Sequence, residues 1–170
     1  MVVYLGLGSN LGDRRSEIMR AVEALAKLGH VAASSALYET EPDGGADSDQ
    51  PMYLNAAVRL ETALSARALL RACLDIERAQ GRVRPVDADK APRTIDIDLL
   101  LYGAAVIEEP GLCVPHPALL SRPFVRIPLA DVALPDLRHP IYGDSLAVCT
   151  PDPSVRRLYQ LASSPAGGSS

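Results

Sequence analysis

The sequence has no excess of positive charge, no long hydrophobic run and few cysteines. Its 17 Lys and Arg residues stand against 21 Asp and Glu residues, and the formal charge of −4 gives no basic field for nucleic acid or an anionic membrane. No apolar stretch is long enough to cross a bilayer, and the first residues lack a signal-peptide pattern. Cys73, Cys113 and Cys149 are scattered and form no Cys-x-x-Cys pair, which indicates reduced thiols. We therefore expect a soluble, cytoplasmic protein with no nucleic-acid or membrane partner.

Three common ligand-binding patterns are also missing. Leu11 stands where the dinucleotide fingerprint that begins at Gly6-x-Gly8 needs a glycine, and no Gly-Lys-Ser/Thr sequence closes a phosphate loop. No spacing of His, Cys and carboxylates predicts a zinc site. We interpret the two glycines as a tight turn with backbone donors near a helix start. Any ATP site must therefore be built in another way.

Hydrophobic periodicity predicts six elements in the order strand, helix, strand, strand, helix, strand. Their expected ranges are 2–7, 13–28, 31–38, 53–60, 65–80 and 92–101. This order is the ferredoxin-like βαββαβ arrangement, an α+β fold with a mainly antiparallel sheet and C-terminal additions. The proline-rich residues 104–144 predict short strands and helical turns. We expect one domain over residues 1–160 and a disordered tail over 161–170.

The last predicted strand contains two aspartates within an aliphatic run. Asp96 and Asp98 lie two positions apart, so they point to the same face, with their Cα atoms about 7 Å apart. Two carboxylates this close repel each other unless a cation lies between them, and hard oxygen ligands suit Mg²⁺. An alternative is an antiparallel strand with one solvated face, on which both aspartates are merely exposed.

Arginines surround the loop that precedes this strand. Arg82, Arg84 and Arg93 could bind phosphate oxygens through planar guanidinium groups and close over a polyphosphate, or they could simply keep the loop soluble. Glu77 falls in an apolar row of the predicted helix 65–80. It is either buried against a partner, with Arg82 as one candidate, or located at the edge of that row, which is the commoner arrangement.

Other residues offer a site for a flat heterocycle. Tyr53 and Asn55 share a strand face, so that one could stack on a ring while the other forms hydrogen bonds to an edge carrying C=O next to N–H. Phe124 is the only phenylalanine in a chain that has no tryptophan. Such a residue belongs to a core more often than to a ligand site. His116 lies between two prolines in a segment that is not expected to be helical, and a lone histidine is usually a packing or surface residue.

Together these segments resemble the hydroxymethyl-dihydropterin pyrophosphokinase family of folate biosynthesis. They follow one another in the family's order over roughly residues 2–145, and the Pro-Arg-Thr-Ile-Asp-Ile-Asp-Leu-Leu signature is highly specific. The matching segments are Gly6-Leu7-Gly8-Ser9-Asn10-Leu11-Gly12, Tyr38-x-Thr40-Glu41-Pro42, Tyr53-Leu54-Asn55-Ala56-Ala57, Glu77-x-x-x-Gly81-Arg82-x-Arg84, residues 92–101, Val114-Pro115-His116-Pro117 and Arg122-Pro123-Phe124.

The resemblance implies transfer of pyrophosphate from ATP to the pterin's hydroxymethyl group, with release of AMP, by a compact monomer. It implies that two Mg²⁺ ions are held by Asp96 and Asp98. It assigns the transferring phosphates to Arg82 and Arg93, and further ATP contacts to Glu77, Arg84, His116 and Arg122. It also implies that Asn55 binds the pterin edge, that the ring stacks between Tyr53 and Phe124, and that Thr40 and Pro42 line the same pocket through their backbones.

The sequence departs from the family in the loop before the signature. Family members commonly carry Arg-Trp-Gly there, whereas residues 86–91 read Val-Asp-Ala-Asp-Lys-Ala, without an aromatic side chain to cover the pterin. We expect weaker closure over the substrates, with Lys90 as a partial substitute. Two alternatives are therefore kept, namely a different Mg²⁺-dependent nucleotide enzyme that uses Asp-x-Asp, such as a phosphoesterase or glycosyltransferase, and a non-catalytic pterin-binding module.

Overall fold

The computed structural model describes residues 1–42, 49–81 and 94–161. These residues form a six-stranded sheet in which every paired neighbour is antiparallel. Its strand order is β5 (Asp96–Tyr102), β1 (Val2–Ser9), β4 (Tyr53–Glu61), β3 (Ala36–Thr40) and β8 (Val155–Gln160), and β2 (His30–Ser34) also pairs with β4. The remaining elements are α1 (Arg14–Leu25), α2 (Ala66–Ala79), the hairpin β6 (Ile107–Glu109) and β7 (Leu112–Val114), and α3 (Pro123–Val132).

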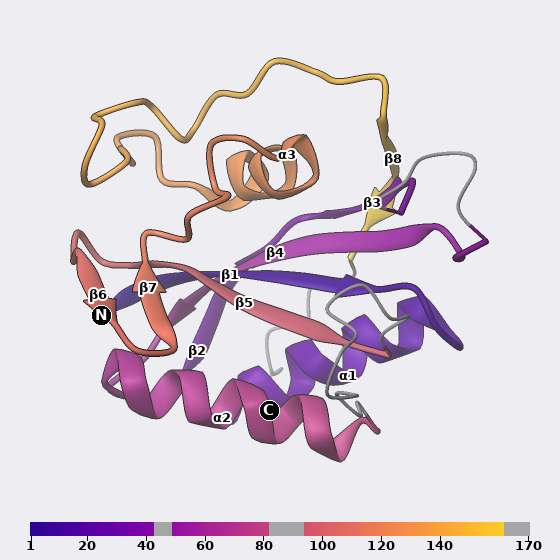
Figure 1. Cartoon of the computed structure of the whole chain (residues 1–170), viewed down its shortest axis with the longest axis horizontal. Coiled ribbons are helices and arrows are strands. Elements are labelled where there is room, and N and C mark those ends of the chain that lie inside the picture. Colours follow the sequence, from indigo (N-terminus) through magenta and orange to yellow (C-terminus); the bar gives the residue numbers. More distant parts are fainter. Residues whose placement is uncertain (43–48, 82–93, 162–170) are drawn as a thin grey trace, which may run out of the picture.

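Helices cover both faces of the sheet. Figure 1 shows α1 and α2 together below it, on what we call the helix-pair face, and α3 above it, on what we call the α3 face. The order β1-α1-β2/β3-β4-α2-β5, with β1 and β4 at the centre of the sheet, confirms the predicted ferredoxin-like βαββαβ arrangement.

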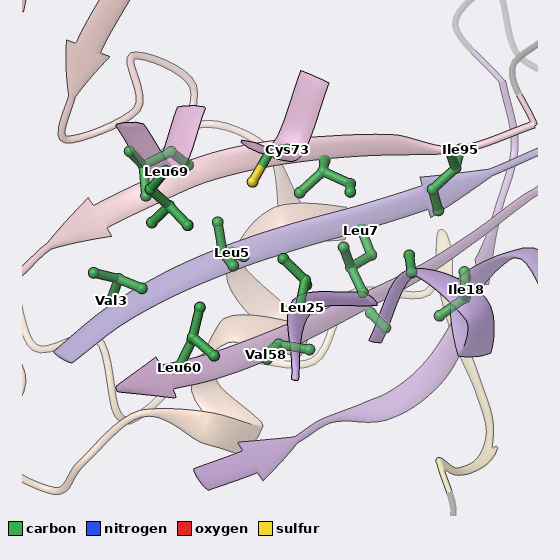
Figure 2. Packing of buried hydrophobic residues seen from close by; sticks show 14 of the residues in the cluster. Val3, Leu5, Leu7, Ile18, Leu25, Val58, Leu60, Leu69, Cys73 and Ile95 are labelled. Atoms are coloured by element: carbon green, nitrogen blue, oxygen red, sulfur yellow. The ribbon is translucent and has the colours of Figure 1, made fainter. Parts of the chain in front are cut away.

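The larger core lies between the sheet and the helix pair. Leu5 and Leu7 of β1 meet Leu25 of α1 and Leu69 of α2 there, as Figure 2 shows. A second core lies on the α3 face, where Tyr4 and Leu100 pack with Leu129 and other apolar residues. The sheet is therefore buried on two sides, and a site on either face must occupy a gap in one of these layers.

Side-chain caps and glycines set the ends of the helices. The Ser65 hydroxyl accepts a hydrogen bond from Ala68 N at 3.2 Å, which confirms it as the N-cap of α2, and Gly81 follows that helix with a φ of +83°. Asp13 caps α1, which ends at Leu25, three residues earlier than predicted. A Cβ on Gly29 would overlap the carbonyl oxygen of Glu61, so the chain approaches β4 too closely there for any other residue.

The predicted strand over 31–38 is in fact two strands that separate at Ser35. The register of pairing with β4 shifts by one residue between Ser34↔Val58 and Tyr38↔Asn55. The buried Ser35 hydroxyl accepts a hydrogen bond from Ala57 N at 2.8 Å. A side chain thus supplies one hydrogen bond of the ladder, which the pattern of apolar residues did not reveal.

Two C-terminal elements were not predicted as such. Helix α3 runs for 10 residues despite Pro128 in its interior, and β8 is a mostly exposed edge strand. Leu161, the first residue of the expected tail, is buried in the larger core, whereas residues 162–170 lie outside the described part of the chain. Among the described residues, no helix is both long and apolar enough to span a membrane.

Candidate active site

A pocket of about 340 Å³ opens on the α3 face of the sheet. This volume is in the range of small-molecule sites. Strands β1, β4 and β5 form its floor, and the end of β3, the segment around His116 and the start of α3 form its walls. The lining residues are Gly6, Leu7, Gly8, Thr40, Glu41, Gln50, Tyr53, Asn55, Ala56, Asp96, Asp98, Leu100, His116, Arg122, Phe124 and Val125.

Two glycines in the central strand give the pocket its depth. Gly6 and Gly8 lie within β1 and not in a turn, so the turn interpretation was wrong. A Cβ on Gly8 would come within 3.3 Å of Asn55 Oδ1, and one on Gly6 within 3.5 Å of the Leu100 side chain. Because neither position carries a side chain, a ligand can lie directly against the backbone of the floor.

Asp96 and Asp98 lie next to each other on β5, at one side of the pocket floor. They pair with Gly8 and Gly6 in the β1–β5 register, and both line the pocket. Ile97 and Leu99 alternate with them and pack in the core of the helix-pair face. The prediction that the two carboxylates share one face of an otherwise apolar strand is confirmed. The carboxylates themselves are only half-buried, so cations and phosphates can reach them.

A buried carboxylate supports this strand from behind. Glu77 of α2 is 3% exposed, and its Oε1 accepts a hydrogen bond from Ile97 N at 2.8 Å. Of the two positions left open for Glu77, the buried one is confirmed and the commoner edge position is not found, because α2 crosses directly behind β5 and encloses the side chain. The contact fixes the peptide that joins Asp96 to Ile97. A direct contact between Glu77 and ATP stays a prediction.

A bulge in β5 anchors the wall that carries His116. The register passes from Leu5↔Leu99 to Tyr4↔Leu101, so Leu100 is the extra residue and lines the pocket. Its carbonyl oxygen accepts a hydrogen bond from His116 N at 2.9 Å. The segment after the cis peptide Val114–Pro115 is thereby attached to the strand that carries the two aspartates.

The hydrogen bonds of His116 define its tautomer. Its Nδ1 accepts a hydrogen bond from Ala118 N at 3.1 Å, so a neutral ring carries its proton on Nε2. Burial lowers the pKa of His116, Arg122 lowers it further, and Asp96 opposes them. Near neutral pH the side chain is therefore an uncharged donor at the pocket wall.

The other end of the pocket is suited to a flat polar ring. The amide Nδ2 of Asn55 donates to Thr40 Oγ1 at 2.8 Å, which fixes the orientation of the amide. Tyr53 and Phe124 line the same pocket, and the Arg122 guanidinium lies 5.6 Å from the centre of the Phe124 ring. Pro42 is buried but does not belong to the pocket lining.

Sequence reasoning missed several lining residues, including Glu41, Gln50 and Leu100. Glu41 belongs to one of the segments that resemble the family, but no role was assigned to it. Gln50 Oε1 accepts a hydrogen bond from Asn10 Nδ2 at 3.4 Å. No pattern marked Leu100, because the bulge depends on pairing with β1. The predicted phosphate-binding residues Arg82, Arg84 and Arg93 lie outside the described residues, as does the altered segment 86–91.

The donor set in the pocket fits Mg²⁺ better than a metal that needs a complete protein cage. Within the described ranges, no three or more His, Cys, Asp and Glu side chains gather in a way that could hold an ion. Mg²⁺ usually takes one or two carboxylates and completes its octahedron with water and substrate phosphates. Asp96 and Asp98 supply such a pair, while an enclosed Zn²⁺ site would need more ligands.

Comparison with known proteins gives a consistent match over most of the chain. Residues 4–134 match the family model described as 7,8-dihydro-6-hydroxymethylpterin-pyrophosphokinase. Two relatives bear the name 2-amino-4-hydroxy-6-hydroxymethyldihydropteridine pyrophosphokinase. The one from Methylorubrum extorquens is 48% identical over 79% of this chain and 83% of its own length. The one from Pseudomonas aeruginosa is 43% identical over 92% of this chain and 96% of its own length.

Solved structures support the fold alone. A crystal structure of HPPK-DHPS from Plasmodium falciparum superposes with a TM-score of 0.66 at 15% sequence identity. The match covers 86% of this chain but 44% of that one, so the chain spans less than half of the Plasmodium protein.

Proposed function

This chain belongs to the 7,8-dihydro-6-hydroxymethylpterin-pyrophosphokinase family, and we propose that the pocket on the α3 face is where it carries out the family's reaction. The enzyme transfers pyrophosphate from ATP to the hydroxymethyl group of 6-hydroxymethyl-7,8-dihydropterin and releases AMP, a step of folate synthesis. One observation carries the assignment to this pocket. The Asp96–Asp98 pair of β5 lines the same cavity as Thr40 of β3, Asn55 of β4 and the two aromatic rings, and β1 lies between β5 and β4.

The pterin occupies the end of the pocket that contains Asn55. With one amide hydrogen donated to Thr40, Asn55 presents its Oδ1 and its second N–H to the ligand. This pair complements a heterocycle edge that offers an N–H next to a C=O. Tyr53 and Phe124 provide the ring faces, and Pro42 shapes the pocket from a buried position next to Glu41.

The triphosphate lies along β5. Asp96 and Asp98 would hold Mg²⁺, two ions in our proposal, which would supply neutralisation of charge on the phosphate oxygens. His116 donates from Nε2 to a phosphate oxygen, and Arg122 provides a permanent positive charge next to it. Arg82, Arg84 and Arg93 complete the set as phosphate ligands in this proposal. Glu77 acts on the ATP site through β5.

Transfer then depends on alignment. The hydroxymethyl oxygen forms a bond to the β-phosphorus of ATP while the bond from that phosphorus to the α-phosphate oxygen breaks, so AMP leaves and the hydroxyl proton is released. The rigid floor of β1, β4 and β5 places the two substrates end to end, which supplies the positioning on which such reactions depend.

We also propose that the chain works as a monomer in the cytoplasm, with residues 1–160 as one domain. The three cysteines carry free thiols, which supports a reducing compartment. Leu158 packs with the larger core, which supports inclusion of β8 in that domain.

Analysis of the nucleotide product tests the function. With ATP, Mg²⁺ and the pterin, the wild type should form one AMP per pterin consumed. Asp96→Ala should lower this rate by about 100-fold or more, because it removes one of two metal ligands. Asp75→Ala is the matched control, since Asp75 pairs with Arg78 on the exposed side of α2. Formation of ADP or inorganic phosphate would indicate another Asp-x-Asp enzyme, and pterin binding without turnover would indicate a binding module.

A further inference from the structure

Behind the pterin end of the pocket, one carboxylate connects three elements. Glu39 of β3 accepts a hydrogen bond from Arg14 of α1 at 3.0 Å, and its other oxygen accepts one from Arg156 of β8. The Glu39 side chain is 13% exposed, and both arginines hold the pKa of this carboxyl below its ordinary value against the effect of burial. Because strand side chains alternate, Glu39 faces α1 while Thr40, the next residue, lines the pocket.

Arg14 extends this connection to the neighbouring strand. Its Nη1 donates to the carbonyl oxygen of Met52 at 2.9 Å, while its Nη2 donates to Glu39. Met52 directly precedes Tyr53, the first residue of β4 and another lining residue. One guanidinium thus binds the chain next to Thr40 and next to Tyr53, and it links the ends of the two strands that form the pterin end.

Strand β8 brings the third member of this group. It lies beyond residues 4–134, the part that matches the family model. Its register places Arg156 opposite Glu39, and the Arg15 guanidinium lies 5.1 Å from the centre of the Tyr159 ring. Leu158 packs against the larger core. The strand is therefore anchored independently of the ion pair, so Arg156 meets Glu39 without having to order β8 by itself.

We propose that Arg14, Glu39 and Arg156, which we call the Glu39 brace, are positioning residues for the pterin. The ladder pairs Thr40 with Tyr53, and the brace secures the chain on either side of this terminal pair without touching the ring itself. Arg156 is exposed, and an exposed ion pair alone adds little to stability. Its contribution is to fill the second oxygen of a carboxylate that is mostly buried, which leaves Glu39 a single arrangement. This inference rests on the proposed function, because it assumes that the pterin lies at that end.

The test compares steady-state kinetics of three variants with the wild type. Glu39→Gln keeps the shape of the side chain and removes its charge, Arg156→Ala removes one partner, and Arg156→Lys keeps a cation. We expect the KM for the pterin to rise about tenfold in Glu39→Gln and about threefold in Arg156→Ala, with recovery in Arg156→Lys. The KM for ATP and kcat should stay within about twofold of the wild type, since β5 is not affected.

Glu109→Gln is the matched control. It also removes the charge of a glutamate paired with an arginine, Arg67, at 2.6 Å, and neither residue lines the pocket. The proposal would be overturned if Glu39→Gln left the pterin KM unchanged. It would also be overturned if the variant raised both KM values and lowered kcat by similar factors, which would indicate a purely structural ion pair. A wild type that forms no pterin-dependent AMP would instead refute the proposed function, so the two failures are distinct.

Discussion

At the scale of single residues, the Thr40 hydroxyl is predicted to control recognition of the pterin. Thr40 and Asn55 are 5% and 6% exposed, and the hydrogen bond between their side chains fixes the Asn55 amide. Thr40→Val keeps the size of the side chain but removes this acceptor, so we expect the pterin KM to rise about tenfold, the equivalent of one buried hydrogen bond. The measurement is initial rate against pterin concentration at saturating ATP.

Thr40→Ser is the matched control for this prediction, because it restores a hydroxyl at the same position. It should keep the pterin KM within about threefold of the wild type. If both variants behave alike, either near the wild type or equally impaired, the hydroxyl does not orient Asn55.

A second residue-scale prediction concerns pH. Burial keeps the pKa of His116 below 6.5 in the folded chain, so folding favours the neutral ring. Stability that depends on neutral His116 is therefore present above pH 6.5 and lost as pH falls through the lower, folded-state pKa. We expect the free energy of unfolding of the wild type minus that of His116→Gln to decrease between pH 8 and pH 5, as measured by urea denaturation.

His139, whose pKa is also lowered by burial, is present in both proteins and cancels in this difference. A difference that is flat or that rises toward pH 5 would show that His116 does not titrate as its surroundings indicate.

The sequence predicted some site residues and not others for physical reasons. The side-chain period of two in a strand is strict, so two aspartates among aliphatic residues had to share a face, as Asp96 and Asp98 do. The direction of Glu77 depends on what α2 packs against, which helical periodicity does not reveal. The role of Gly6 and Gly8 was also hidden, because an absent side chain leaves space only once the neighbouring strands are in place.

At the scale of elements, the position of β5 depends on α2. Replacing Glu77 by Leu leaves the buried N–H of Ile97 without its acceptor, which typically costs about 1–3 kcal/mol. Glu77→Gln keeps an acceptor oxygen and should lose less. We therefore expect the urea midpoint to fall in the order wild type, Glu77→Gln, Glu77→Leu. The KM for ATP should rise in the same order, because the peptide between the two aspartates loosens.

A Glu77→Leu protein with unchanged ATP KM despite lowered stability would contradict the link between α2 and the phosphate end. Cys73→Ser serves as a control, since Cys73 is buried one turn earlier on α2 and makes no contact with the pocket. It should alter stability without a selective change in the KM for ATP.

Sequence patterns did not predict α3 and β8, and each element shows a reason why such patterns fail. Pro128 lacks a backbone N–H and normally ends a helix, yet α3 continues through it while Asp131 accepts hydrogen bonds from Ala36 N at 3.1 Å and from the Tyr38 hydroxyl at 2.7 Å. Tertiary contacts of this kind outweigh local propensity. Strand β8 is an edge strand with one neighbour, so most of its side chains are exposed and show no alternation.

At the scale of the whole molecule, the site is a consequence of the three-layered arrangement, with α1 and α2 on one face of the sheet and α3 on the other. The ferredoxin-like order of elements was predictable because the spacing of apolar residues shows which face of each strand and each helix is buried. The location of the pocket was not predictable from the sequence. It depends on α3, which covers only part of its face of the sheet and leaves β1, β4 and β5 accessible next to Asp96. Because α3 leaves part of this face open, the polar residues of β5 and those of β3 and β4 line one cavity.

A crystal structure with both substrates bound would show whether they meet in this pocket. The chain would be crystallised with Mn²⁺, the pterin and an ATP analogue whose α,β-bridging oxygen is replaced by a methylene group, which blocks release of AMP. We expect anomalous metal density at the Asp96 and Asp98 carboxylates, the pterin edge at Asn55 and the hydroxymethyl group facing the β-phosphate. Nucleotide or pterin bound elsewhere, or metal away from both aspartates, would contradict this expectation.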